Sequence, residues 1–184
     1  MSILKIARIG HPVIRAAARP VPKKAFADPL FQKLIDDMHE TMYEYEGVGV
    51  AGPQVHESWR LAVIEVPGSD DRTRAEVPFM VLVNPVVTPL GDERESAWEG
   101  CLSVPELRGV VPRFKRVRLE AQDREGKPFS LEASDFLARV IQHECDHLDG
   151  HVYLDRMADM RTLAFLKEFD EHVANADDEE TERE

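Results

Sequence analysis

Apolar residues between positions 30 and 45 recur every three or four residues, which is the spacing of one buried helical face. They are Leu30, Phe31, Leu34, Ile35, Met38, Met42 and Tyr45. Asp28 can cap the N-terminus of such a helix, and Pro29 suits its first turn. The pattern therefore predicts a helix that begins at Pro29 and ends at Gly47.

Two apolar, β-branched runs predict a first pair of strands. One run covers residues 61–66 and the other covers residues 79–83. The stretch between them, residues 68–76, is polar and is interpreted as an exposed hairpin loop.

A second pair of strands is predicted where apolar and charged residues alternate. The apolar positions are Val117, Leu119 and Ala121, and the charged ones are Arg116, Arg118 and Glu120. A turn over residues 123–126 then leads to a return strand that contains Phe129 and Leu131.

From residue 134 onward the chain carries another helical pattern. Ser134 can cap this helix, and Gly150 can end it. Its predicted buried stripe consists of Phe136, Leu137, Val140, Ile141 and Leu148. A third helix is predicted over about residues 159–173. Strands that precede helices in this order indicate an α+β domain with a mostly antiparallel sheet.

Residues 47–54 read Gly-Val-Gly-Val-Ala-Gly-Pro-Gln, so three glycines and a proline interrupt any regular pattern. Glycine permits conformations that other residues avoid, and proline removes a backbone donor. We therefore expect a shaped loop here rather than a helix or a strand.

The amino-acid composition is consistent with this predicted fold. A chain of 184 residues with 43% hydrophobic and 32% charged residues suits one globular domain. Residues 175–184 contain six acids and one arginine, a composition that stays solvated. We expect a single domain over residues 1–174 and a disordered acidic tail over residues 175–184.

Charge and targeting signals limit the partners. A net charge of −12 disfavours broad contact with phosphate backbones, so no direct, specific DNA binding is expected. Residues 1–10 contain too few apolar positions for a signal peptide, and no stretch reaches membrane-spanning length. With only two cysteines, a disulfide framework is not expected either. The sequence therefore predicts a cytoplasmic protein without a membrane partner.

The most specific chemical pattern is His143-Glu-Cys-Asp-His147. Residues four apart share one face of a helix, so His143 and His147 can bind one metal ion, with Glu144 in reach of its water. The alternative is a helix whose histidines only pack. Two imidazoles beside an apolar stripe would be costly to bury without partners, which disfavours that alternative.

Most catalytic metal sites use three protein ligands and keep one position open for water. The candidate third ligand is Cys101 in the segment Glu99-Gly-Cys-Leu-Ser103, where Gly100 lets the backbone approach closely. A free cysteine that only packs is the alternative. Cys145 projects from the opposite side of the helix to the histidines, so we expect it to pack.

Three segments, residues 47–54, 99–103 and 142–150, resemble in order the three signature motifs of the peptide deformylase family. The similarity also includes Gly10-His-Pro-Val-Ile-Arg15 and extends to about Asp155. The resemblance implies an α+β fold in which a mostly antiparallel sheet packs around a central metal-binding helix. It also implies that residues 1–174 form a single catalytic deformylase domain.

The implied activity is removal of the N-formyl group from formyl-methionine at the start of nascent polypeptides, at or near the ribosome. Cys101, His143 and His147 would hold one iron(II), with zinc, nickel or cobalt able to take its place. Ligand type alone would have favoured zinc. Glu144 would accept the proton of the attacking water and deliver it to the departing amine.

The resemblance also implies how the substrate is contacted. The side-chain amide of Gln54 and the backbone N–H of Leu102 would face the developing oxyanion. The implied substrate-binding residues are Gly49, Val48, Arg108, Phe136 and Val140. The sequence does not say whether Arg139 faces the same pocket.

One position departs from the family pattern. Two alanines usually precede the residue before the glutamine of the first motif, whereas here Ala51 is followed by Gly52. Loss of one methyl group is expected to loosen this loop slightly without abolishing the site.

Three other functions fit parts of the sequence. A metallopeptidase would share the helical histidine pair, although Cys101 in its Gly-Cys-Leu-Ser setting favours deformylation. A non-catalytic structural-zinc protein would need a fourth ligand, and none has suitable spacing. A basic cluster of Arg113, Lys115, Arg116 and Arg118 could bind nucleic acid or the ribosome, but its alternation is more typical of a solvated strand face.

Overall fold

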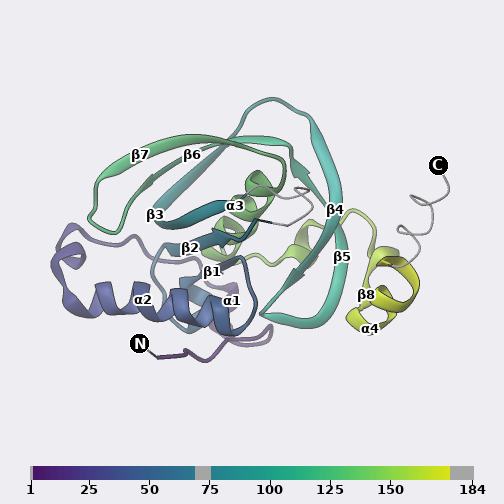
Figure 1. The fold of residues 1–184 in the computed structure, drawn as a ribbon, viewed down its shortest axis with the longest axis horizontal. Coiled ribbons are helices and arrows are strands. Elements are labelled where there is room, and N and C mark those ends of the chain that lie inside the picture. The colour runs from purple at the N-terminus through teal and green to yellow at the C-terminus, as the bar shows by residue number, and fades with distance from the viewer. Residues whose placement is uncertain (1, 69–75, 175–184) are drawn as a thin grey trace.

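The helix that carries the two histidines lies inside a folded antiparallel sheet (Figure 1). The structure, a computed structural model, describes residues 2–68 and 76–174. Its longer helices are α2 (Pro29–Glu44) and α3 (Asp135–Leu148), and its short ones are α1 (Pro12–Arg15) and α4 (Leu166–Phe169). Among the described residues, no helix combines the length and the apolar character needed to cross a bilayer.

Five strands form the first sheet, in the order β1-β2-β3-β6-β7, and every neighbouring pair is antiparallel. They are β1 (Gly49–Ala51), β2 (Leu61–Val66), β3 (Val77–Pro89), β6 (Arg116–Gln122) and β7 (Pro128–Ser134). The second sheet contains β4 (Arg94–Cys101), β5 (Val104–Phe114) and β8 (Ala164–Phe165). This arrangement confirms the predicted α+β fold with mostly antiparallel sheet around a central helix.

Helix α2 forms as the periodicity predicts. The Asp28 side chain accepts a hydrogen bond from the Leu30 backbone N–H at 2.9 Å, so it is the expected N-cap. The helix ends at Glu44 rather than at Gly47, because Glu46 turns into the left-handed region with φ of 54°. The Gly47 N–H then donates to the Met42 carbonyl at 2.9 Å and closes the end of the helix.

Both predicted strand pairs form. Leu61 faces Val83 across β2 and β3, and Leu119 faces Leu131 across β6 and β7. Strand β3 is longer than the apolar run predicts, because it continues past a bulge between Val83 and Val86 to pair with β6. Most of the predicted hairpin loop, residues 69–75, lies outside the described residues.

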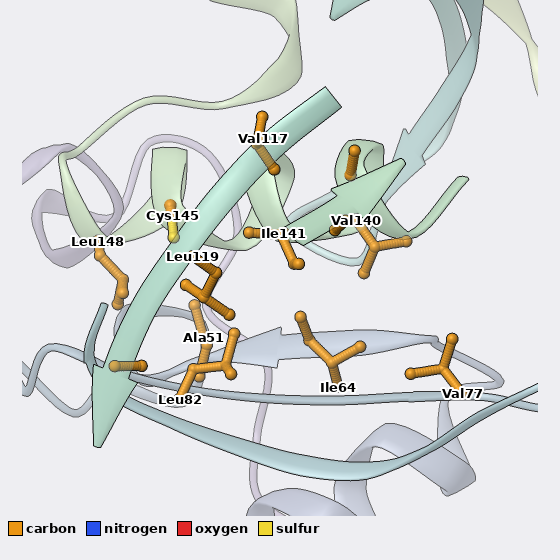
Figure 2. Close-up of a cluster of buried hydrophobic side chains, with 14 of the residues drawn as sticks. Ala51, Ile64, Val77, Leu82, Val117, Leu119, Val140, Ile141, Cys145 and Leu148 are labelled. Atoms are coloured by element: carbon orange, nitrogen blue, oxygen red, sulfur yellow. The ribbon is translucent and has the colours of Figure 1, made fainter. Parts of the chain in front are cut away.

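Side chains from both halves of the first sheet bury α3 between them (Figure 2). The helix contributes Ala138, Val140, Ile141, Cys145 and Leu148 to this core. Two details of its prediction are wrong. Phe136 is 38% exposed because it faces the cleft described below, and the Ser134 side chain makes no capping hydrogen bond. Gly150 adopts the expected helix-ending conformation with φ of 80°.

The predicted third helix is wrong over most of its length. Residues 160–162 form a 3₁₀ turn, β8 follows, and only then does α4 begin, which a π-helical turn over Asp170–Ala174 extends. The Asp159 side chain caps the 3₁₀ turn at the Arg161 N–H, at 2.9 Å. Phe165 then pairs with Leu107 of β5, so tertiary pairing overrides helix propensity here.

The glycine-rich segment is more regular than expected. It forms the short strand β1 and then a 3₁₀ turn over Gly52–Val55. A Cβ at Gly52 would lie 2.6 Å from the backbone oxygen of Trp59. Backbone oxygens of Glu57 and Trp59 occupy the space that a methyl group would need. The expected loosening of the loop stays a prediction.

Candidate metal centre and active site

The three predicted metal ligands meet at one point. Helix α3 presents His143 and His147 one turn apart, with ring centroids 5.0 Å from each other. Strand β4 ends at Cys101, whose Sγ lies 3.2 Å from Nε2 of His147. One potential ligand atom from each residue lies within 4.8 Å of the other two. One thiolate and two imidazoles at this spacing suit a single transition-metal ion.

The surroundings of the three residues favour metal binding. His143 Nδ1 lies 2.9 Å from a carboxylate oxygen of Glu99, which leaves its Nε2 to face the site. Burial alone would raise the pKa of the Cys101 thiol, but His147 and His143 beside the sulfur hold that pKa well below its usual value. The Ser103 N–H also donates to Sγ, at 3.3 Å. Cys101 is therefore poised as a thiolate, the form that binds metal.

Cys145 does not belong to this centre. It is 7% exposed and packs in the core between α3 and the sheet, as Figure 2 shows. Burial raises the pKa of its thiol to about 12. This confirms the expectation that Cys145 packs.

Glu144 lies beside the three ligands with an unpaired oxygen. The residue is 3% exposed, and its Oε2 makes no hydrogen bond within the described part of the chain. Burial raises the pKa of the carboxyl group, although His143 and His147 oppose this. A buried carboxylate with a free oxygen and a raised pKa is suited to accept and release a proton.

Gln54 is held with its amide group toward the cysteine. Its Oε1 accepts from the Ala51 N–H at 2.8 Å, which orients Nε2 toward Cys101 Sγ, 3.6 Å away. Leu102 directly follows Cys101 at the turn between β4 and β5 and lines the same cleft. The structure therefore brings both predicted oxyanion donors to the cysteine.

A cleft of about 1240 Å³ leads to this point. Of the predicted site residues, its lining contains Val48, Gly49, Gln54, Cys101, Leu102, Arg108, Phe136, Val140, His143 and Glu144. His147 lies behind it, almost fully buried at 1% exposure. Arg108 lies across Gly100, where a Cβ would lie 1.3 Å from its Nη1, so a side chain at this position would require the guanidinium to move.

The sequence assigned no role at the centre to four charged residues that surround it. They are Glu99, Arg113, Arg139 and Asp146, and all four are buried. Glu99 accepts from Arg113 Nε and Nη2 at 2.9 and 3.0 Å and from Arg139 Nη1 at 2.8 Å. Burial would raise the pKa of Glu99, but His143 and Arg113 lower it to about 2. Glu99 therefore stays ionised behind His143.

Arg113 was predicted to lie on a solvated strand face together with its basic neighbours, and this is wrong. It is 5% exposed and bridges Glu99 to Asp146, whose Oδ2 lies 2.5 Å from its Nη1. Arg116 and Arg118 lie on the expected solvated face, where both bond Glu132. Lys115 is partly exposed and pairs with Glu93 at 3.2 Å. The sequence signal for Glu99 was its place two residues before Cys101, since alternate residues of a strand share a face.

Proteins similar in sequence to this chain are peptide deformylases, in agreement with the geometry of the site. The model of the polypeptide deformylase family matches residues 3–162. Peptide deformylase 2 of Pseudomonas putida is 44% identical over 166 residues, which cover 90% of this chain and 93% of the relative. Peptide deformylase 1 of Bordetella pertussis is 42% identical over 174 residues, covering 94% and 98%.

Solved structures with the same fold include peptide deformylase from Thermotoga maritima, with a TM-score of 0.77 and 38% identity over 86% of this chain and 100% of that one. An actinonin-bound class I type b peptide deformylase from Acinetobacter baumannii gives a TM-score of 0.76 and 33% identity over 86% of this chain and 100% of that one. Since family, relatives and fold agree over nearly the whole length, the chain belongs to the polypeptide deformylase family and is an enzyme of that type.

Proposed function

We propose that this chain hydrolyses the N-formyl group from the N-terminal formyl-methionine of nascent polypeptides. The observation that supports the proposal is the buried Glu144 carboxylate, which lines a cleft and has an unpaired oxygen beside a thiolate and two imidazoles. The names of the relatives support the same reaction.

Cys101, His143 and His147 would hold one divalent ion in this scheme. When bound, such an ion supplies Lewis-acid chemistry, because it lowers the pKa of water to about 7 and polarises a carbonyl group. Family resemblance favours iron(II) as the working metal, with zinc, nickel or cobalt able to occupy the same ligands. The residues present leave a position open, since the group contains three protein ligands rather than the four of a structural zinc site.

Glu144 would act as the proton carrier of the reaction. Its carboxylate accepts a proton from the attacking water as the new bond between oxygen and the formyl carbon forms. It then delivers that proton to the amine nitrogen as the carbon–nitrogen bond breaks, so formate and a free amino terminus leave. The raised pKa caused by burial suits both halves of this transfer.

The developing negative charge on the formyl oxygen needs donors that are already in place. The Gln54 Nε2 group is oriented by the bond from Ala51 to its Oε1, which supports this role. The backbone N–H of Leu102 would be the second donor, from the turn that carries Cys101. Neither group would have to reorganise during the reaction.

The methionine side chain would enter the apolar part of the cleft. That part is lined by Val48, Phe136 and Val140. Phe136 is partly exposed in the cleft, as a side chain that contacts a bound ligand would be. The backbone of Gly49 would contact the substrate main chain, and Arg108 would contact the peptide beyond methionine. An open cleft of this kind accepts the end of a longer chain.

Such a substrate is made in the cytoplasm, at or near the ribosome, so the enzyme would act there. The net charge of −12 supports action on protein termini rather than direct, specific binding to DNA. Protein synthesis is therefore the process that would supply its substrate.

The decisive variant is Glu144→Gln, which keeps the size of the side chain but removes its ability to accept a proton. Turnover of a formyl-Met peptide at neutral pH should fall by about 10²–10⁴. Metal content should not change, because the three ligands are untouched. Glu120→Gln on the exposed face of β6 is the matched control and should behave as the parent enzyme. Near-normal turnover in Glu144→Gln with full metal occupancy would contradict the mechanism.

The same experiment separates the alternatives. A metallopeptidase would cleave an internal bond of an unformylated peptide, so such a peptide is assayed beside the formylated one. A non-catalytic structural-zinc protein would turn over neither.

A further inference from the structure

Arg139 lies one helical turn before His143 and on the same face of α3. Its side chain is buried, with the residue 6% exposed. The guanidinium donates to Glu99 Oε1 at 2.8 Å, to the Val111 carbonyl at 2.8 Å and to the Glu95 carbonyl at 2.7 Å. A single side chain on α3 is thus fixed to both β4 and β5.

The helix α3 and the strand β4 supply different metal ligands. Strand β4 ends at Cys101, whereas α3 carries His143 and His147. The sulfur and the imidazoles can reach one ion only if strand and helix keep their separation. Arg139 spans that separation at three points.

Glu99 connects the same two elements next to the ligands. It lies two residues before Cys101 on β4, and its Oε2 lies 2.9 Å from Nδ1 of His143. The two arginines complete its set of donors, because Arg139 shares Oε1 with Arg113 Nε, and Arg113 Nη2 shares Oε2 with His143. The carboxylate therefore has two donors on each oxygen and a fixed orientation.

We propose that Arg139 is a positioning residue: it fixes Glu99 and the spacing of β4 and α3, so that Cys101, His143 and His147 converge on one ion. This inference rests on the metal site of the proposed function. It assigns Arg139 no contact with the ion or the substrate. The residue acts through Glu99 and through the two strand carbonyls.

Removing the guanidinium should change the site more than the fold. Glu99 would keep both bonds from Arg113 and its contact with His143, so no buried charge would lose all of its partners. What would be lost is the attachment of α3 to the carbonyls of Glu95 and Val111. Lysine cannot replace that attachment. Its single ammonium group cannot donate to carbonyls on both strands in the geometry of the planar guanidinium.

The matched control is Arg60, which ties the other end of α3 to β3. Its Nη1 pairs with Asp149, the C-cap of the helix, at 2.6 Å, and its Nε and Nη2 donate to the Pro85 carbonyl at 3.2 and 3.1 Å. Arg60 does not line the cleft. It therefore offers the same kind of attachment to the same helix, away from the ligands.

The test compares Arg139→Met, Arg139→Lys and Arg60→Met as purified full chains. Nickel(II) affinity is measured by competition with a chromophoric chelator, the cobalt(II) form is examined for its thiolate charge-transfer absorption, and melting temperatures are recorded. Both Arg139 variants should lose about 10–100-fold in nickel affinity and show altered cobalt absorption. Arg60→Met should melt earlier but bind nickel as the parent does.

Unchanged nickel affinity and cobalt absorption in Arg139→Met would overturn the proposal, as would an equal loss in Arg60→Met. Full affinity in Arg139→Lys would also overturn it, since charge alone would then suffice. The lysine variant keeps the buried cation and so remains informative should the methionine variant not fold. No peptide is used, so a negative result here leaves the Glu144→Gln test of deformylation unaffected.

Discussion

Gly49 lies directly against Glu144: a Cβ at Gly49 would lie 2.4 Å from Oε1 of that carboxylate. A side chain at this position of β1 would therefore clash with the present position of the Glu144 carboxylate. We predict that Gly49→Ala displaces Glu144 and lowers turnover by about 10²-fold, a loss that a misplacement near 1 Å can cause. Metal content should not change, because the ligands lie on α3 and β4.

The control for this prediction is Gly68→Ala. Among the residues that the structure describes, the nearest atom to a Cβ there is Cβ of Glu76 at 3.4 Å, so the substitution should be tolerated. Steady-state assays with a formyl-Met peptide and metal analysis on the same samples decide the matter. Full activity in Gly49→Ala would show that Glu144 can move aside without consequence.

Gly52 leads to a prediction about stability rather than catalysis. A methyl group at this position would lie 2.6 Å from the Trp59 carbonyl and 3.0 Å from that of Glu57, and backbone atoms cannot rotate away. Gly52→Ala should therefore lower the free energy of unfolding by about 1–3 kcal/mol, although the family pattern has alanine here. Thermal and denaturant unfolding measure the change. A variant as stable as the parent would mean that the 57–59 backbone readily shifts.

Local periodicity was enough to predict the elements that pack by one face. Helix α2 and the β6–β7 pair show regular burial along the chain, and their sequences show it too. Strands β4 and β5 were not predicted. Their residues include buried charges such as Glu99 and Arg113, so no apolar alternation marks them, and cross-strand pairing from Arg94 to Cys101 holds them together.

The same limit applies to the site. The two histidine ligands follow from short-range spacing, because His143 and His147 must share a helix face. The charged residues behind them do not, since Arg139 meets Glu95 and Val111 only after α3 docks on the second sheet. For this reason the sequence left the direction of Arg139 open.

The acidic tail, residues 175–184, lies outside the described residues, so its role stays a prediction from composition. Six acids and few apolar residues cannot bury a useful surface. We propose that residues 1–174 form a single catalytic domain. A chain ending at Ala174 should keep its melting temperature and should keep turnover within about twofold. A large loss of either would show that the tail contributes to the fold or the site.

The choice of metal can be tested in air. A thiolate-bound iron(II) centre that opens to a cleft should lose activity as the ion or the Cys101 sulfur is oxidised. The nickel form of the same preparation should persist, and iron samples kept without oxygen serve as the control. Equal persistence of both metal forms in air would argue against iron as the working metal.

The two cysteines should differ sharply toward a thiol reagent. Cys101 lines the cleft, and the histidines beside it lower the pKa of its thiol. Cys145 packs in the core, where burial raises the pKa of its thiol to about 12. The thiolate is the reactive form, so the buried Cys145 thiol should stay protonated and react slowly near neutral pH.

Metal-free protein treated with iodoacetamide at pH near 7 should therefore be alkylated once, at Cys101, and peptide mapping by mass spectrometry locates the label. Nickel(II) added beforehand should protect that residue, because the sulfur is then a ligand. Cys145→Ala should leave both labelling and protection unchanged, whereas Cys101→Ala should remove both. Rapid labelling of Cys145 in the folded protein, or metal protection of Cys145 rather than Cys101, would contradict the assignment of the thiol ligand.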